Sequence, residues 1–254
     1  MEEKFKQVIE KFKQLTEKEC YKVLLTEEIP SILDNKIGGQ PYLPIGEEYP
    51  KDEDGNLMPL LLQVNLEDID LENFPKKGIL EIFTDKDVDY PCQYSIRYYE
   101  SGLEYQKELP IVDNSHYIIN KAVKIDLQKD ICHMTVNDYK FHKIMLKLVN
   151  EIYGTNFENL VQLDDFFGEF DWFDKIYDEL SNPPITIGGY PDFTQSDVRC
   201  GELADKEECL FKLDSCANYS LFHLSDSGIL FTLISLDDLK KGKFENAVVD
   251  WDCC

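Results

Sequence analysis

A dense group of polar side chains lies on the segment from residue 192 to residue 199. Its members are Asp192, Thr194, Gln195, Ser196, Asp197 and Arg199, and Pro191 precedes them. Two carboxylates, an amide and a guanidinium on one loop could hold a ligand through charge-assisted hydrogen bonds. In the alternative interpretation, the carboxylates accept hydrogen bonds from turn amides while Arg199 pairs with a carboxylate to fix the loop. The residue types fit both interpretations.

Other local patterns for catalysis or cofactor binding do not occur in the sequence. It contains neither of the glycine-rich phosphate-binding patterns, no Gly-x-Ser-x-Gly and no Cys-x-x-Cys, and its four histidines occur singly. We therefore expect no cofactor and no metal, and assign no catalytic residue. A cysteine nucleophile with a histidine base stays open, because such partners are neighbours only in space. The eight scattered cysteines are interpreted as reduced thiols.

Two short segments of the chain recur at an offset of 150 residues. Ile37-Gly38-Gly39-Gln40-Pro41 returns as Ile187-Gly188-Gly189-Tyr190-Pro191, and Gly78-Ile79-Leu80 returns as Gly228-Ile229-Leu230. This predicts an internal duplication with a pseudo-two-fold axis, so that a site is expected at the seam between the copies or in both of them. The predicted ligand-binding residues are Gly39, Pro41, Asp192, Gln195, Asp197, Arg199 and Asp226.

The elements that must position these residues follow from the apolar pattern. Apolar residues at helical spacing predict an amphipathic helix over residues 2–19, with Leu15 as the last member of its stripe. Short apolar runs predict strands over residues 60–66, 78–84, 95–100, 122–127, 210–213 and 229–234, and an end strand around residues 250–252. Apolar stripes over residues 144–152 and 172–180 predict two helices between the copies, the first capped by Asn137 or Asp138 and ended by Gly154.

The region from residue 151 to residue 182 combines acidic and aromatic side chains. It holds nine acids, one base and eight aromatics. Aromatic residues anchor interfaces and acids attract basic partners, so this insertion could be a docking surface, with Phe166, Phe167, Trp172, Asp164 and Asp165 as its contact residues. Alternatively, the aromatics pack against the sheet and the acids remain in water.

The net charge restricts the classes of partner. A formal charge of −24 argues against binding to nucleic acid or to anionic lipid and favours basic proteins or cations. Residues 1–20 lack the apolar run of a secretory signal, and no stretch approaches the roughly 20 apolar residues that span a bilayer. We therefore expect a cytoplasmic protein, whose oligomeric state the sequence does not indicate.

Several of these segments resemble the YwqG-like family, also called domain of unknown function 1963. The resemblance is carried by the Gly-Gly-x-Pro segment, the strand at residues 60–66, Gly78-Ile-Leu-Glu-Ile-Phe83, the segment at residues 188–199, Asp226-Ser-Gly-Ile-Leu-Phe231 and the terminal Asp250-Trp-Asp-Cys-Cys254. Tyr49 stands where the family pattern has tryptophan. The resemblance implies a fold and no established activity.

The predicted architecture is an α+β protein with largely antiparallel sheets. It is one domain over residues 1–254, with repeat one at about 22–135, a helical insertion at about 136–182 and repeat two at about 183–254. Two classes of function follow. The first is a non-catalytic interaction protein, inhibitor-like or immunity-like, that binds a basic protein. The alternative is a small-ligand-binding protein or enzyme with a site at the seam between the repeats.

Overall fold

Ten strands form one sheet in a computed structural model that describes residues 2–86, 88, 92–112, 117–168, 171–199, 201–225 and 227–253. The strands are β1 (Lys18–Leu25), β2 (Lys36–Ile37), β3 (Leu60–Asn65), β4 (Ile79–Thr84), β5 (Tyr94–Tyr99), β6 (Val123–Cys132), β7 (Ile185–Gly188), β8 (Glu208–Asp214), β9 (Ile229–Ile234) and β10 (Val248–Asp252). Their order across the sheet is β10-β9-β8-β7-β1-β6-β2-β3-β4-β5. All the pairings in this order are antiparallel.

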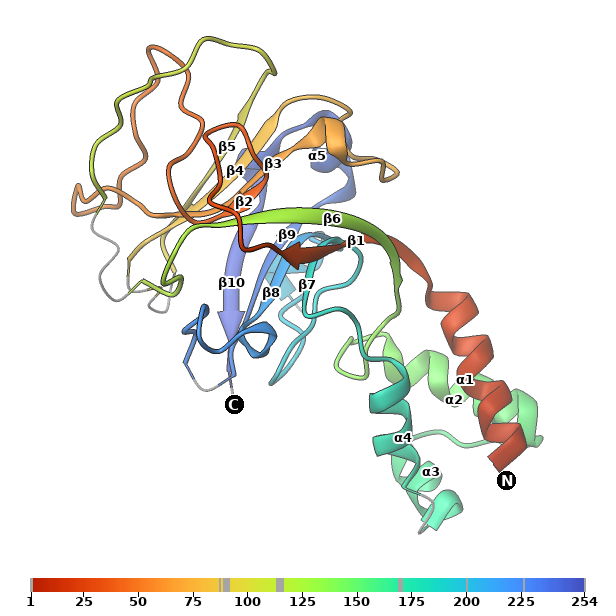
Figure 1. Ribbon diagram of the computed structural model, residues 1–254. Coiled ribbons are helices and arrows are strands. Elements are labelled where there is room, and N and C mark those ends of the chain that lie inside the picture. Colours follow the sequence, from red (N-terminus) through yellow and green to blue (C-terminus); the bar gives the residue numbers. More distant parts are fainter. Residues whose placement is uncertain are drawn as a thin grey trace.

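The two longest strands, β1 and β6, form the centre of the sheet. Their register runs from Lys18 opposite Cys132 to Leu25 opposite Ile125. On one side of this pair lie β2 to β5, and on the other side lie β7 to β10. The sheet is curved and nearly closed (Figure 1), and Tyr94 of β5 and Trp251 of β10, from its two edge strands, pack against the same hydrophobic core.

One face of the sheet carries the main hydrophobic core because apolar side chains alternate along the strands. On β4, Leu80 and Ile82 belong to this core, whereas Glu81 between them points to the opposite face. Leu213 of β8 and Leu230 of β9 contribute in the same way from the other half. The outer face is also covered, since all six residues of β4 are buried. Loops therefore pack on the outer face of the sheet.

The helices α1 to α4 gather in a separate group beside the sheet, with the N-terminus among them (Figure 1). The helices of the protein are α1 (Glu2–Thr16), α2 (Phe141–Tyr153), α3 (Leu160–Phe167), α4 (Trp172–Glu179) and α5 (Leu236–Lys241). Phe12 of α1 meets Phe141 of α2 with ring centroids 5.3 Å apart. Phe167 of α3 and Ile176 of α4 lie in the same hydrophobic cluster. We call this group, α1 to α4, the helical unit.

The structure corrects the predicted N-terminal helix at its end. The helix stops at Thr16, and not at residue 19, because β1 begins at Lys18. Leu15 was assigned to the apolar stripe but is 66% exposed, whereas Thr16 is buried and donates a hydrogen bond to the carbonyl of Phe12. The spacing of the stripe is therefore correct only as far as Phe12.

The predicted strands and inserted helices are largely confirmed. The strands predicted at residues 60–66, 78–84 and 229–234 correspond to β3, β4 and β9, and the end strand corresponds to β10. Gly154 ends α2 in the left-handed conformation with φ 73°, as predicted. The N-terminus of α2 differs, because Lys140 occupies the cap position and makes no side-chain cap hydrogen bond. Among the described residues, no helix is long and apolar enough to cross a membrane.

Candidate functional site

The loop at residues 189–199 leaves the sheet through two glycines that no other residue could easily replace. Gly188, the last residue of β7, and Gly189 after it have φ 74° and 79°, in the left-handed region that favours glycine. A Cβ on Gly189 would lie 2.8 Å from the sulfur of Cys132 and 2.9 Å from Cβ of Cys20. Both the backbone conformation and the close packing therefore require glycine here.

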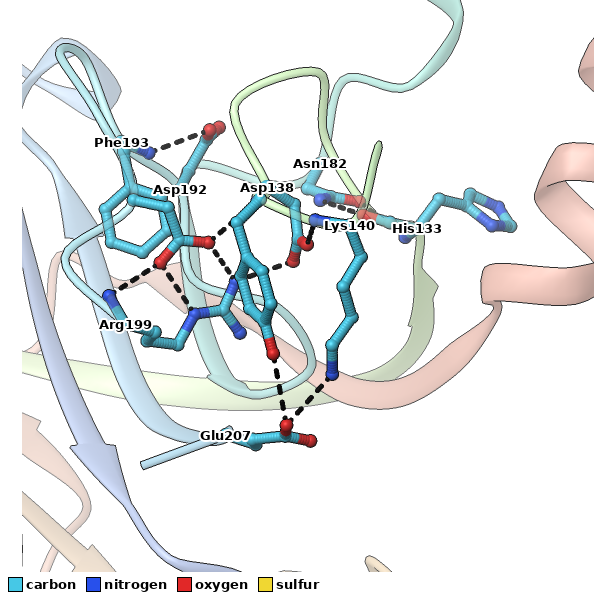
Figure 2. A network of polar contacts seen from close by, with 10 residues as sticks. His133, Asp138, Lys140, Asn182, Asp192, Phe193, Arg199 and Glu207 are labelled. Carbon is cyan, nitrogen blue, oxygen red and sulfur yellow. Dashed lines mark hydrogen bonds and ion pairs between the residues drawn. The ribbon is translucent and has the colours of Figure 1, made fainter. Parts of the chain in front are cut away.

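Arg199 forms the centre of the polar network that this loop makes (Figure 2). Its guanidinium donates from Nε to Asp197 Oδ1 over 2.9 Å, and from Nη2 to Asp197 Oδ2 and Asp138 Oδ2 over 2.6 Å each. The guanidinium also lies 5.3 Å from the ring centroid of Tyr139 and 5.5 Å from that of Phe193. Arg199 is only 4% exposed. The charge is thus matched by two carboxylates inside the protein.

Asp197 and Arg199 are both held in their charged forms. Burial opposes ionisation of Asp197, but the hydrogen bonds from Arg199 and from the Tyr139 amide outweigh it and lower the pKa of the carboxyl. Burial likewise acts against the charged guanidinium, yet Asp197 and Asp138 raise the pKa of Arg199. The network ties the loop to the turn before α2, which favours the loop-fixing interpretation of these residues.

A second ring of contacts continues from this network toward the surface. Tyr139 donates its hydroxyl to Glu207 Oε1 over 3.1 Å, and the ammonium of Lys140 lies 3.0 Å from the same oxygen. The bond from Lys140 lowers the pKa of Glu207. On the other side, the side chain of Asn182 accepts from the amide of His133 and donates to its carbonyl. Figure 2 shows both groups of contacts beside Arg199.

The other predicted residues of this loop do not reach Arg199. Asp192 accepts a hydrogen bond from the Phe193 amide over 3.0 Å, and burial raises the pKa of its carboxyl. Gln195 donates its side-chain amide to the carbonyl of Cys253 over 2.7 Å and its backbone amide to Asp252. Gln195 therefore links the loop to the residues at and after the end of β10. Asp226 lies outside the described residues.

Gly39 and Pro41 lie in the other half of the sheet, on a loop that begins in the same way. Gly38 and Gly39 have φ 72° and 85°, and a Cβ on Gly39 would lie 2.8 Å from Cβ of Ala122. This loop leads to Tyr42, whose backbone amide donates to Gln63 Oε1 and Glu81 Oε1 over 2.7 Å each. The loop is thereby held on polar side chains of β3 and β4.

Glu81 is a buried carboxyl group that the sequence analysis did not select. It is fully buried on the outer face of β4, and burial raises its pKa to about 8. Its Oε2 atom has no hydrogen-bond partner among the described residues. Lys36 on β2 is also buried, and burial lowers its pKa to about 8. A glutamate between Leu80 and Ile82 in an apolar strand is the signal that could have identified this position.

The aromatic and acidic residues of the insertion divide between the interior and the surface. Phe167 and Trp172 are each 4% exposed and belong to the core of the helical unit. Asp164 accepts the indole N–H of Trp172 over 2.8 Å. Phe166 is 36% exposed, and Asp165 is exposed beside it.

A recess of about 530 Å³ lies on the surface of the helical unit at Phe166. Its lining consists of Thr155, Asn156, Phe157, Gln162, Asp165 and Phe166. The rings of Phe157 and Phe166 lie 5.2 Å apart and form its apolar part, and Asp165 supplies a carboxylate. We call this feature the Phe166 recess. Of the five predicted contact residues, it contains Phe166 and Asp165.

The fold and these networks define an α+β protein in which buried charged groups hold two loops on a nearly closed, mostly antiparallel sheet. The chain belongs to the family described as domain of unknown function (DUF1963), whose model matches residues 35–253. This match confirms the family resemblance and includes the insertion, whereas α1 lies outside it. None of the curated proteins matches this chain. Among the described residues, no group of three or more His, Cys, Asp or Glu side chains could hold a metal ion.

Proposed function

We propose that this protein is a non-catalytic cytoplasmic interaction protein, inhibitor-like or immunity-like, that binds a basic protein through the Phe166 recess. The observation that supports this proposal is the exposure of Phe166 next to Asp165, although its neighbour Phe167 is buried in the core. The surrounding segment, residues 151–182, has nine acids against one base. An exposed aromatic beside a carboxylate, within an acid-rich segment, suits the lysine or arginine side chains of a partner.

The chemistry of recognition would combine two effects. The aliphatic stem of a lysine or arginine can pack on the rings of Phe157 and Phe166, and its cationic end can approach the ring face or the carboxylate of Asp165. Acids around the recess, among them Glu158, would accelerate the encounter with a basic protein. Added salt should therefore slow association more than it changes dissociation.

The test is a comparison of matched variants of the full chain in a pull-down from native cytosol. Glu158→Gln with Asp165→Asn removes two charges at the recess, and Phe166→Ala removes the exposed ring. Glu53→Gln with Asp54→Asn removes two charges at exposed positions on the sheet side and is the control. We expect both recess variants to lose a basic protein that the wild type and the control retain. Equal recovery of basic proteins by all four forms would end the proposal.

We also infer that the two halves of the sheet are copies of one unit. The strand order supports this, because β2 to β5 lead outward from one side of the central pair as β7 to β10 do from the other. Register shifts occur between Leu60 and Leu62 on β3 and between Cys209 and Phe211 on β8. Asn65 and Asp214 each cap a short 3-10 helix after these strands.

Superposition of the two halves tests this duplication. Residues 30–85 placed on residues 180–235 should bring β2, β3 and β4 onto β7, β8 and β9 with the same chain direction. A different path of the chain between the matched strands would contradict the duplication.

A further inference from the structure

We propose that Cys20 and Cys132 are a redox-active dithiol that closes to a reversible disulfide when the protein meets a hydroperoxide. The two sulfur atoms lie 2.7 Å apart, and both residues are fully buried. They lie on the central strands β1 and β6, where Cys132 is opposite Lys18 and Cys20 is opposite Asp130. The two thiols are thus brought together from positions that are 112 residues apart in the sequence.

The geometry needs little change for a bond to form. A disulfide has a sulfur–sulfur distance of about 2.05 Å, so the two atoms need to approach by only roughly 0.7 Å. β1 and β6 are paired over eight residues from each strand, which holds the two sulfur atoms in register. Both residues are free cysteines. Oxidation would therefore join two side chains that already touch.

The surroundings assign different roles to the two thiols. The two sulfur atoms are in contact over 2.7 Å, so either thiol can hydrogen-bond to the thiolate of the other and stabilise negative charge there. This hydrogen bond lowers the pKa of Cys132, with Lys212 and the Tyr190 amide acting in the same direction against burial and Asp130. The same bond and burial raise the pKa of Cys20. Cys132 is accordingly the attacking thiolate, and Cys20 is the thiol that resolves the intermediate.

A small oxidant can approach this pair from a recess on the surface. The recess has a volume of about 420 Å³, and its lining includes Lys18, Gly188, Gly189, Glu208 and Cys209. Gly189 lies directly against both cysteines, since an added Cβ would meet Cys132 and Cys20 within 3 Å. Gly189 thus lines the recess and also lies against the sulfur of Cys132. A hydroperoxide is small enough for this approach, whereas bulky thiol reagents are not.

The chemistry takes place in two balanced steps. The Cys132 thiolate attacks one peroxide oxygen, so that a sulfur–oxygen bond forms, the oxygen–oxygen bond breaks and the departing oxygen takes up a proton. Cys20 then attacks the sulfur of this sulfenic acid, forming the disulfide and releasing the hydroxyl as water with the proton of Cys20. The two thiols together supply the two electrons that reduce the peroxide. A thiol reductant restores the dithiol by exchange.

The position of the pair indicates what its oxidation would change. Cys20 lies four residues after the end of α1, and Cys132 is the last residue of β6 before the chain enters the helical unit. Next to Cys132, His133 is bound through its backbone to Asn182, on the segment that returns from α4 to β7. A disulfide would therefore join β1 to β6 at the point where both strands connect to the helical unit.

The test begins with the wild-type full chain, so that it does not depend on any variant. The protein is treated with hydrogen peroxide, free thiols are blocked, and unreduced peptides are mapped by mass spectrometry. We expect a cross-link between Cys20 and Cys132 with the loss of two hydrogens, which is reversed by dithiothreitol. The exposed Cys216 is the control thiol, and Cys132 should be consumed at least roughly tenfold faster.

Two variants then separate the roles of the cysteines. Cys20→Ser keeps a hydrogen-bond donor beside Cys132 and should accumulate a sulfenic acid on Cys132, which dimedone captures when the oxidised protein is unfolded in its presence. Cys132→Ser should give no such adduct on Cys20. The proposal is overturned if Cys132 in the wild type stays reduced while Cys216 is oxidised, or if the cross-links join other cysteines. An adduct on Cys20 in the Cys132→Ser variant would overturn the assigned direction of attack.

Discussion

A single guanidinium group, that of Arg199, joins the loop at residues 189–199 to the turn before α2. Burying such a charge is unfavourable unless every partner is present, and here Asp197 and Asp138 are both within 2.6 Å. Arg199→Met keeps most of the volume but leaves two carboxylates without a cation. We expect the free energy of unfolding to fall by roughly 3–5 kcal/mol. Chemical denaturation with circular dichroism measures this change.

The control for Arg199→Met removes the carboxylate charges as well. Adding Asp138→Asn and Asp197→Asn to the variant should recover part of the lost stability, because no uncompensated charge then remains buried. A loss below about 0.5 kcal/mol in Arg199→Met alone, the size of an ordinary surface substitution, would show that the ion pair does not hold the loop.

Glu81 gives the protein a predictable dependence on pH. Its pKa of about 8 in the folded protein is above the ordinary value of 4.5. The folded state therefore holds the proton more tightly than the unfolded chain, so the contribution of Glu81 is complete below about pH 4.5 and is lost as the pH rises to about 8. Glu81→Gln stays neutral, so its unfolding free energy relative to the wild type should increase by a few kcal/mol from about pH 5 to about pH 8.

Denaturant titrations at several pH values between these limits measure the effect. Lys36 titrates at the upper end of this range, because its pKa is lowered from 10.5 to about 8 and the Glu81 carboxylate favours its charged form, so the comparison is made below that pH. The same substitution at the exposed Glu108 is the matched control. Parallel stability curves for wild type and Glu81→Gln would contradict the buried, proton-binding carboxyl.

At the scale of residues, the sequence predicted the polar cluster but not the contacts that its members make. The density of polar groups from Asp192 to Arg199 was visible, and pairing of Arg199 with a carboxylate was one of the two interpretations. Asp138 could not be predicted as its second partner, because this contact joins positions 61 residues apart that only the folded chain brings together. Gln195 could not be separated from Arg199, because its contacts with Asp252 and Cys253 depend on where β10 ends.

At the scale of elements, the two loops that leave β2 and β7 depend on their glycine pairs. Gly39→Val and Gly189→Val would each place a side chain at positive φ and within 2.8 Å of a packed neighbour. We expect each to lower the free energy of unfolding by on the order of 1–3 kcal/mol, measured by thermal or chemical denaturation.

Gly46→Val separates the two causes of this destabilisation. Gly46 also has positive φ, 97°, but a Cβ there meets nothing within 4 Å. This control should lose stability through backbone strain alone, and therefore less than the other two variants. Unchanged melting temperatures in Gly39→Val and Gly189→Val would remove the physical reason for the recurring Gly-Gly-x-Pro segment.

Most helices and strands could be predicted from apolar periodicity, and the prediction failed where charged residues interrupt that pattern. The strands β3, β4 and β9 are mostly apolar and almost wholly buried, so they stood out. The central strand β1 was not predicted, because its first two residues fall within the predicted helix and charged residues interrupt its apolar pattern. α3, which has the same length as the predicted α4, was not predicted.

At the scale of the whole molecule, the protein has two parts with different hydrophobic cores. The curved sheet carries the networks that hold its loops, and the helical unit presents the Phe166 recess within an acid-rich segment. The order of strands could not be derived from the sequence, because it depends on the long-range pairing of β1 with β6. The recess could not be derived either, since Phe166 and Phe167 are adjacent aromatics and only helix packing decides which of them is buried.

The measurement that tests the central claim most directly is amide hydrogen exchange of the full chain with and without the basic protein that it captures. A partner bound at the Phe166 recess should slow exchange over residues 155–166 and leave the loops at residues 39–50 and 189–199 unchanged. Exchange that is unchanged over residues 155–166, with protection at those two loops, would contradict docking at the helical unit and would move the binding site to the sheet.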